Sequence, residues 1–144
     1  MKIAVGSDHG GLKLKNEIKK YLTGLGHIIK DFGTDTEQSC DYPDFAYPAA
    51  EAVAKGECEK GILFCGSGVG VSIVANKVPG IRAVNAMSVE IAKQSREHGD
   101  ANVLTLGGKY VSVEDAKNIV DVWLKTPFSG DERHLRRIKK IERK

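Results

Sequence analysis

Short apolar runs alternate with longer amphipathic stretches along most of the chain. An apolar run of about 4–8 residues bounded by turn residues is typical of a strand that is buried on both faces. Runs of this kind predict five strands, at Lys2–Ser7, His27–Phe32, Ile62–Cys65, Ile81–Asn85 and Asn102–Leu106.

The stretches between these runs carry helical spacing and helix-boundary residues. In the first stretch, Leu12, Ile18 and Leu22 recur at helical intervals and Gly24 follows as a stop. Ser88 is an expected N-cap, and Ser-Val-Glu-Asp at 112–115 is close to a capping box. Helices are predicted at 10–24, 46–55, 71–76 and 88–97, in a segment that begins at 112 and carries Trp123, and at 132–143.

The predicted strands and helices follow one another in strict alternation, with short connections. Such alternation predicts a parallel sheet with helices on both faces. We therefore predict an α/β fold: a three-layer αβα sandwich with a five-stranded, parallel, Rossmann-like sheet and an extra C-terminal helix. No repeat or linker interrupts the pattern, so residues 1–144 are predicted to form a single domain. Ligands of such sheets bind where loops leave the carboxyl ends of the strands.

The bulk composition excludes several classes of protein. Hydrophobic residues make up 41% and charged residues 28% of the 144 positions, as in an ordinary globular chain. The net charge of +3 is small and concentrated near the C-terminus, so no nucleic-acid partner is expected. Three cysteines without metal-like spacing predict neither a disulfide framework nor a metal site. Met1 leads directly into the first strand and no apolar run reaches the ~20 residues of a membrane span, so we expect a cytoplasmic protein without a membrane partner.

The segment Gly61–Ser72 combines a buried strand, a cysteine and a glycine-rich turn that opens a helix. The turn has glycines at 66, 68 and 70, directly after Cys65. N–H groups at a helix start lack partners within the helix, and the helix dipole favours negative charge there. A thiol in this position is expected to ionise more readily than a free cysteine. The alternative is that Cys65 is only a small buried apolar residue.

The glycine spacing of this turn differs from the two common phosphate-binding motifs. A dinucleotide fingerprint requires G-x-G-x-x-G after the first strand, whereas this turn reads G-x-G-x-G after the third. A Walker A motif requires a Gly-Lys-Ser/Thr sequence, which does not follow. The turn is therefore interpreted as a cradle for an anion or a developing oxyanion.

Two further loops carry side chains suited to acid–base chemistry. Asp8 and His9 follow the first predicted strand, although they could form no more than a capped turn. His98 precedes the fifth strand, where it either complements the C-terminal end of a helix or joins Cys65. The second possibility requires its loop to fold over the sheet edge or a second subunit to supply it.

Arg133 and Arg137 are four residues apart on the last predicted helix and therefore share a face. They form either a solvated basic surface or a bidentate clamp for a phosphate. Together with Cys65 as a thiolate base, and with Asp8 and His98 as acid–base groups, such a clamp suits proton transfer next to the carbonyl of a sugar phosphate.

Seven motifs occur in order along nearly the whole chain: GSDHGG at 6–11, DYP at 41–43, CGSGVG at 65–70, ANK at 75–77, GIRA at 80–83, HGDANVL at 98–104, and RH at 133–134 with Arg137. In these motifs and their spacing the chain resembles the type B ribose-5-phosphate isomerases. The wider group also contains allose-6-phosphate and galactose-6-phosphate isomerases. The resemblance implies interconversion of ribose 5-phosphate and ribulose 5-phosphate in the pentose phosphate pathway, without a metal or cofactor.

The resemblance also implies roles for individual residues. The implied catalytic residues are Cys65, Ser67, Asp8 and His98, and the implied substrate-binding residues are Asp8, His9, Gly66, Ser67, Gly68, Val69, Gly70, Gly99, Lys109, Arg133 and Arg137. Cys65 moves the proton between C1 and C2 while the turn holds the enediolate. Asp8 and His98 assist ring opening. One branch of the family has a glutamate base where this chain has Val71, so Cys65 must serve here.

Members of the family are homodimers or dimers of dimers whose sites are shared across the interface, and such a site would include His98. The chain departs from many relatives at three positions. Gly99 replaces Asn, Lys109 replaces Arg and Ser67 replaces Thr, and these changes bear on substrate preference more than on reaction type. The expected function is ribose-5-phosphate isomerisation. The alternatives are an isomerase of six-carbon sugar phosphates and a non-catalytic sugar-phosphate-binding module on the same fold.

Overall fold

The computed structural model describes residues 1–143. Its five strands form one sheet in the order β2-β1-β3-β5-β4, in which every neighbouring pair is parallel. The strands are β1 (Lys2–Ser7), β2 (Ile28–Asp31), β3 (Lys60–Cys65), β4 (Ala83–Asn85) and β5 (Val103–Gly107). The predicted sheet is confirmed. β2 and β4 are shorter than their apolar runs indicated, because both are edge strands that pair with a single neighbour.

Seven helical segments connect these strands or follow them. They are the 3₁₀ turn η1 (His9–Gly11) and the helices α1 (Leu12–Gly24), α2 (Pro43–Ala54), α3 (Val69–Asn76), α4 (Val89–Gly99), α5 (Val113–Lys125) and α6 (Glu132–Ile141). Ser88 and Ser112 cap α4 and α5 as predicted, each accepting a backbone N–H of the first turn. α2 begins earlier than its apolar pattern indicated, because Pro43 is well suited to the first turn of a helix.

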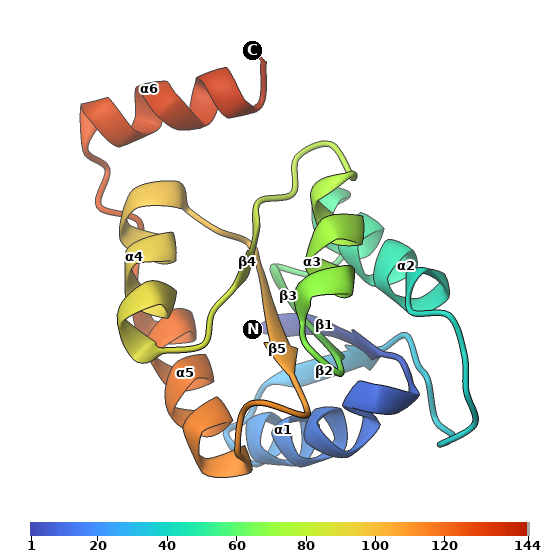
Figure 1. The fold of residues 1–144 in the computed structure, drawn as a ribbon. Coiled ribbons are helices and arrows are strands. Elements are labelled where there is room, and N and C mark those ends of the chain that lie inside the picture. The colour runs from blue at the N-terminus through green and yellow to red at the C-terminus, as the bar shows by residue number, and fades with distance from the viewer. Residues whose placement is uncertain (144) are drawn as a thin grey trace.

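Helices cover both faces of the sheet, which confirms the predicted three layers (Figure 1). On one face, α1, α4 and α5 pack against the sheet in a cluster that contains Ile18, Phe64 and Trp123. On the other face, α2 and α3 enclose a cluster that contains Leu63 and Cys65. Successive side chains of a strand point to opposite faces, so Phe64 and Cys65 belong to different halves of the core.

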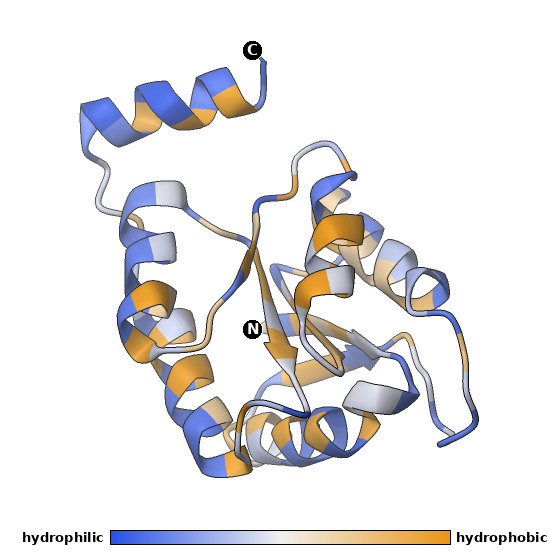
Figure 2. Cartoon of the chain, in the orientation of Figure 1, coloured by the Kyte–Doolittle hydropathy of each residue, from blue (hydrophilic) through white to orange (hydrophobic). Residues whose placement is uncertain are grey.

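α6 lies apart from the sandwich, beyond the C-terminal end of α4 (Figure 1). Figure 2 shows hydrophilic residues on the outer side of this helix and a hydrophobic stripe on the side that faces the rest of the molecule. Two residues of the α6 region, Leu135 and Ile141, are nevertheless 40% and 63% exposed. The apolar stripe is therefore left largely uncovered by the single chain.

Within the residues that the structure describes, none of the helices has the length and apolar character that crossing a membrane requires.

Candidate active site

Three buried strands end side by side where the chain carries its most reactive side chains. In the parallel register, Ser7 at the end of β1 lies beside Phe64, and Cys65 at the end of β3 lies beside Gly107 of β5. The strand order reverses between β1 and β3, and this kind of switch point is where open α/β sheets bind ligands. The loops after Ser7 and Cys65 therefore meet at one place, as the sequence indicated.

The Cys65 thiol lies at the base of the glycine-rich turn. Cys65 is 4% exposed, and its Sγ accepts a hydrogen bond of 3.1 Å from the N–H of Gly68. Gly68 has a φ of +81°, a left-handed conformation that favours glycine, and this conformation turns its N–H back toward the sulfur. The thiol is thus paired with the main chain and is not simply a packed apolar group.

Two side chains from neighbouring strands hold the turn in this shape. Thr105 on β5 donates its hydroxyl to the Gly68 carbonyl at 2.8 Å, and Asn85 on β4 approaches the Ser67 carbonyl at 3.4 Å. The Ser67 hydroxyl accepts the N–H of Val69 at 3.1 Å. The sequence analysis did not identify Thr105 or Asn85, because nothing in their local sequence shows that they face this turn.

Main-chain donors remain available around the thiol. The N–H groups of Ser67, Gly70 and Val71 have no hydrogen-bond acceptor within residues 1–143. Gly70 and Val71 lie in the first turn of α3, where N–H groups have no intrahelical partner and the helix dipole favours negative charge. The predicted cradle of backbone amides is therefore present, and its geometry suits an oxyanion.

A cavity of about 460 Å³ opens over this turn, within the usual size range of small-molecule sites. We call it the thiol pocket; its lining includes Asp8, Tyr42, Cys65, Gly66, Ser67, Val69, Gly70 and Lys109. Gly68 lies behind the lining and acts through its hydrogen bond to the sulfur. The thiol pocket thus brings together most of the residues predicted from the turn and from the first strand end.

Asp8 forms the capped turn that the sequence left open, and it also lies in the lining of the thiol pocket. Its Oδ1 accepts the N–H of Gly11 at 3.1 Å, so it caps η1. Gly11 must lack a side chain here, because a Cβ would lie 2.6 Å from the main chain of Phe64. This close approach brings Asp8 next to the end of β3.

Tyr42 and Lys109 complete the walls of the thiol pocket. The Tyr42 ring lies against Gly70, where a Cβ would be only 2.8 Å from its Cζ. The Lys109 side chain runs along Gly66, and its ammonium forms no ion pair within residues 1–143. Lys109 is therefore a free cation at the edge of the pocket. The sequence analysis noted Tyr42 only as part of a motif and did not predict that it forms a wall of the pocket.

His9 lies outside the lining of the thiol pocket. It is exposed, and its Nδ1 accepts the N–H of Cys40 at 3.2 Å. This bond fixes the ring so that Nε2 is the nitrogen left to act as a donor. His9 therefore borders the site, and a bound substrate must extend beyond the pocket to reach it.

A second cavity, also of about 460 Å³, contains the residues predicted near the other end of the chain. We call it the histidine pocket; its lining includes Arg82, Ser95, His98, Gly99, His134 and Arg137. The His98 and His134 rings stack with centroids 4.1 Å apart and an interplanar angle of 17°. Burial lowers the pKa of His134 below its usual value, and the positive charges of His98 and Arg133 lower it further.

The two arginines of α6 lie four residues apart in one continuous helix, as predicted, but their contacts differ. Arg137 lines the histidine pocket and forms no ion pair within residues 1–143. Arg133 is exposed outside the lining, with its Nη2 3.4 Å from Nε2 of His134 and its Nε 4.0 Å from Asp131. A clamp formed by both arginines is therefore not closed within the single chain.

The two pockets lie at opposite ends of the sheet. α4 returns the chain from the carboxyl end of β4 to the amino end of β5, so His98, near its C-terminus, lies far from the strand ends that carry Cys65. In Figure 1 the turn before α3 is at the lower side of the sheet, and the end of α4 with α6 is at the upper side. The loop of His98 does not fold over the sheet edge, so one chain does not unite His98 with Cys65.

The described residues contain no group of three or more His, Cys, Asp or Glu side chains that could hold a metal ion. What they do contain is a thiol among main-chain donors, a carboxylate, free cations and a histidine pair. This set can remove a proton from carbon, stabilise the resulting oxyanion and bind a phosphate.

Comparison with known proteins identifies the family over nearly the whole chain. A protein family described as Ribose/Galactose Isomerase matches residues 3–141. Ribose-5-phosphate isomerase B of Escherichia coli is 48% identical over 140 residues, which cover 97% of this chain and 93% of that protein. Among solved structures, ribose-5-phosphate isomerase B of Clostridium thermocellum superposes with a TM-score of 0.97 at 52% identity, covering 99% of this chain and 96% of the other.

A further solved structure contains a ligand. Ribose-5-phosphate isomerase B of Mycoplasma genitalium, with bound ribulose-5-phosphate, superposes with a TM-score of 0.94 at 42% identity, covering 99% of this chain and 94% of the other. The resemblance noted from the sequence motifs is thereby confirmed. The chain belongs to the ribose/galactose isomerase family, as a sugar-phosphate isomerase homologous to the type B ribose-5-phosphate isomerases.

Proposed function

We propose that this protein interconverts ribose 5-phosphate and ribulose 5-phosphate, with Cys65 as the base. The observation that carries the proposal is the thiol at the end of β3, which is bonded to the Gly68 N–H and faces a cavity lined by unpaired main-chain donors. A sugar that is held in its open-chain form in this pocket has the acceptor it needs for the proton on its reacting carbon.

The chemical step is a transfer of one proton between adjacent carbons. The Cys65 thiolate takes the hydrogen on C2 of the aldose as a proton, and the electron pair of that C–H bond forms the C1–C2 double bond of a cis-enediolate. The N–H groups of Ser67 and Gly70 stabilise the negative oxygen, an effect worth about 2.7–4 kcal/mol per donor in a comparable oxyanion hole. The Ser67 hydroxyl polarises the same oxygens. The electron pair of the C1 carbonyl, displaced onto O1 when the double bond forms, takes up the hydroxyl proton of O2. The thiol then returns its proton to C1, and the electron pair left on O2 forms the C2 carbonyl of the ketose.

Ring opening and phosphate binding require the second pocket. We propose that Asp8 and His98 open the furanose ring, and that His9, Arg133 and Arg137 bind the phosphate, with Lys109 and Gly99 next to the sugar. The thiol pocket and the histidine pocket lie at opposite ends of the sheet within one chain. We therefore propose a homodimer, or a dimer of dimers, in which each active site combines the thiol pocket of one chain with the histidine pocket of another. The uncovered apolar stripe of α6 supports such an interface.

Turnover assays of the purified protein test the proposed function. We expect ribose 5-phosphate to be isomerised and Cys65→Ala to lower kcat by about 10²–10⁴-fold, because it removes a positioned base. Substrate affinity should change little, since the amide cradle and the cations remain. Cys58→Ala is the matched control, because it changes a buried cysteine that neither lines the thiol pocket nor contacts His9, and its activity should stay near wild type. Full turnover in Cys65→Ala would contradict the assignment of the base.

A six-carbon sugar phosphate is the second candidate substrate. The family description includes galactose, and a Cβ built on Gly99 in the histidine pocket meets no atom within 4 Å. The space at this position could accept a longer sugar. Galactose 6-phosphate and allose 6-phosphate should therefore be assayed beside ribose 5-phosphate, and a higher kcat/KM for either of them would replace the pentose proposal.

A further inference from the structure

Two sets of contacts join α6 to the sandwich, one near each end of the helix. Near its start, the His134 ring stacks on His98, and the preceding segment is attached through the N–H of Ser129, which donates to the Glu97 carbonyl at 3.2 Å. Just after its last turn, the Glu142 carboxylate accepts a hydrogen bond of 3.1 Å from Nη1 of Arg82. The proposed phosphate ligand Arg137 lies on the helix between these two attachments.

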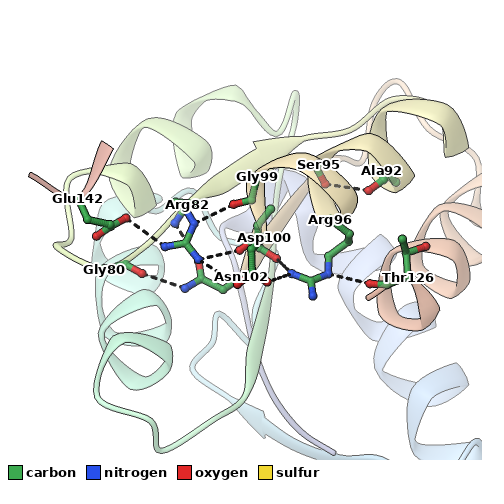
Figure 3. A network of polar contacts seen from close by, with 11 residues as sticks. Gly80, Arg82, Ala92, Ser95, Arg96, Gly99, Asp100, Asn102, Thr126 and Glu142 are labelled. Carbon is green, nitrogen blue, oxygen red and sulfur yellow. Dashed lines mark hydrogen bonds and ion pairs between the residues drawn. The ribbon is translucent and has the colours of Figure 1, made fainter. Parts of the chain in front are cut away.

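The Arg82 guanidinium binds the ends of two helices at once (Figure 3). Its Nε donates to the Gly99 carbonyl at 2.9 Å and its Nη2 to the Asp100 carbonyl at 2.8 Å, while Nη1 reaches Glu142. Carbonyls at a helix C-terminus have no intrahelical donor, so Arg82 supplies the missing donors for α4. The turn that carries His98 and the end of α6 are therefore held by one planar group.

Arg82 is itself held firmly. Its backbone N–H donates to Oδ1 of Asn102 at 2.8 Å, next to the start of β5. On the other side of the turn, Arg96 binds the Asp100 carboxylate at 2.8 Å and the Thr126 carbonyl at 3.1 Å (Figure 3). The side chains of Arg82 and Glu142 are 18% and 15% exposed, so their ion pair is largely shielded from water. A shielded charge pair of this kind is much less screened than a pair on the surface.

We propose that Arg82 is a positioning residue of the active site, acting through its bond to Glu142. By binding α4 and α6 together it sets where Arg137 and His134 lie relative to His98. The part of this inference that concerns substrate rests on the proposed function above. Arg82 itself need not touch the substrate, since three of its donors are already used by protein oxygens.

The planar shape of the side chain is essential to this role. Arg82 serves three acceptors in three directions at once, and its donors form a rigid fork. A lysine would keep the charge but place a single compact ammonium in the same space, which cannot reach all three oxygens in this geometry. Arg82→Lys is therefore expected to loosen α6 while leaving the charge of the molecule unchanged.

Glu142→Gln is the sharpest test, because it removes one charge from the end of α6 and leaves α4 intact. Glu132→Gln is the matched control: it removes the same charge from the exposed first turn of the same helix, away from Arg82. We expect Glu142→Gln to raise KM for the phosphorylated sugar by roughly tenfold, with kcat within about twofold of wild type, because the phosphate ligands are displaced while the base is not. Glu132→Gln should leave KM unchanged.

Hydrogen exchange provides a readout that does not depend on turnover. In Glu142→Gln and in Arg82→Lys, amides of residues 132–141 should exchange faster than in wild type and in Glu132→Gln, whereas amides of β3 should not change. Equal KM values in Glu142→Gln and Glu132→Gln, or equal exchange of α6 in those two variants, would overturn the proposal. If wild-type protein turned over no sugar phosphate, the proposed function would fail, and hydrogen exchange would still decide whether Arg82 fixes α6.

Discussion

The thiol pocket and the histidine pocket have similar volumes but are built in different ways. In the thiol pocket the donors are main-chain N–H groups at the ends of three paired strands, and side chains of β4 and β5 hold the turn that carries them. The histidine pocket is formed by side chains at helix ends, and its shape depends on guanidinium hydrogen bonds between distant segments. We infer that the first pocket tolerates changes elsewhere in the molecule, whereas the second responds to single substitutions and to pH.

The largest effect is expected from mixing two variants that each damage one pocket. Cys65→Ala damages the thiol pocket and Arg137→Ala the histidine pocket, so at substrate concentrations far below KM each variant alone should have very low activity. If each site uses both copies, a mixed dimer has one site with both lesions and one intact site. Random reassociation should therefore restore about one quarter of wild-type activity, since half of the dimers are mixed.

The control for this experiment is the same pair of variants without dissociation and reassociation, which should remain inactive. Failure of the mixed sample to regain activity, with mixed dimers shown to be present by mass spectrometry, would mean that each chain forms its own site. The two pockets would then have to be united by a rearrangement within one subunit.

A smaller effect is expected when support is removed from the thiol pocket. Thr105→Val keeps the shape of a fully buried side chain but removes the donor to the Gly68 carbonyl. The Gly68 carbonyl keeps the N–H of Ser72 at 3.3 Å, so the expected loss is that of one hydrogen bond, about 0.5–1.5 kcal/mol of unfolding free energy. The alkylation rate of Cys65 should also change, because its sulfur accepts a hydrogen bond from the Gly68 N–H and that N–H is then less firmly held. Urea denaturation measures the loss of unfolding free energy. The alkylation rate of Cys65, measured in a protein whose Cys40 and Cys58 are replaced by serine, measures the change at the thiol.

Thr105→Ser restores the hydroxyl and should return the alkylation rate of Cys65 to the wild-type value. If Thr105→Val and Thr105→Ser alkylate at the same rate, the hydroxyl of Thr105 does not shape the turn. The effect of Thr105→Val on KM should be small, because the residue makes no contact with the histidine pocket.

The smallest effect is expected from acidification, which should loosen α6 at the histidine pocket and leave the thiol pocket unchanged. The pKa of His134 is lowered in the folded protein relative to the usual value of about 6.5, so folding favours its neutral form. The corresponding stability is present above pH ~6.5 and is lost as the pH falls through the folded-state pKa. Between pH 7.5 and 5.5, amides of α6 should therefore exchange progressively faster than expected from the intrinsic pH dependence of exchange.

His134→Phe keeps an aromatic ring against His98 but cannot titrate, so it should remove the pH-dependent part of this loosening. Exchange in β3 should show no such component in either protein. An unchanged acid response of α6 in His134→Phe would assign the effect to another group.

The sequence predicted the thiol pocket better than the histidine pocket, for a physical reason. A cysteine followed by a glycine-rich turn and a helix is a local pattern, and the structure places Cys65, Ser67 and Gly70 around one cavity as expected. The strand order and the layers were also predictable, because they follow from alternation of hydrophobic runs. The β2 and β4 boundaries were less predictable, since edge strands lack one neighbour.

The histidine pocket depends on contacts between segments far apart in the chain. Arg82 binds Glu142 across 60 positions and Arg96 binds Thr126 across 30, and neither contact leaves a mark in the local sequence. Helical spacing placed Arg133 and Arg137 on one face, yet only Arg137 lines the pocket, because the position of α6 relative to α4 decides which side chain enters. The contact between Arg82 and Glu142 became visible only with the tertiary structure.

The alignment of the strand ends limits how this protein can vary in length. Side chains alternate along β3, with Phe64 toward α1 and α5 and Cys65 toward α2 and α3. Insertion of a single residue within this strand would exchange the two faces and carry the sulfur to the wrong layer. Evolutionary gains and losses of residues should therefore accumulate in the connections, such as the segment between β2 and α2, while the spacing from Lys60 to Cys65 stays constant among active relatives.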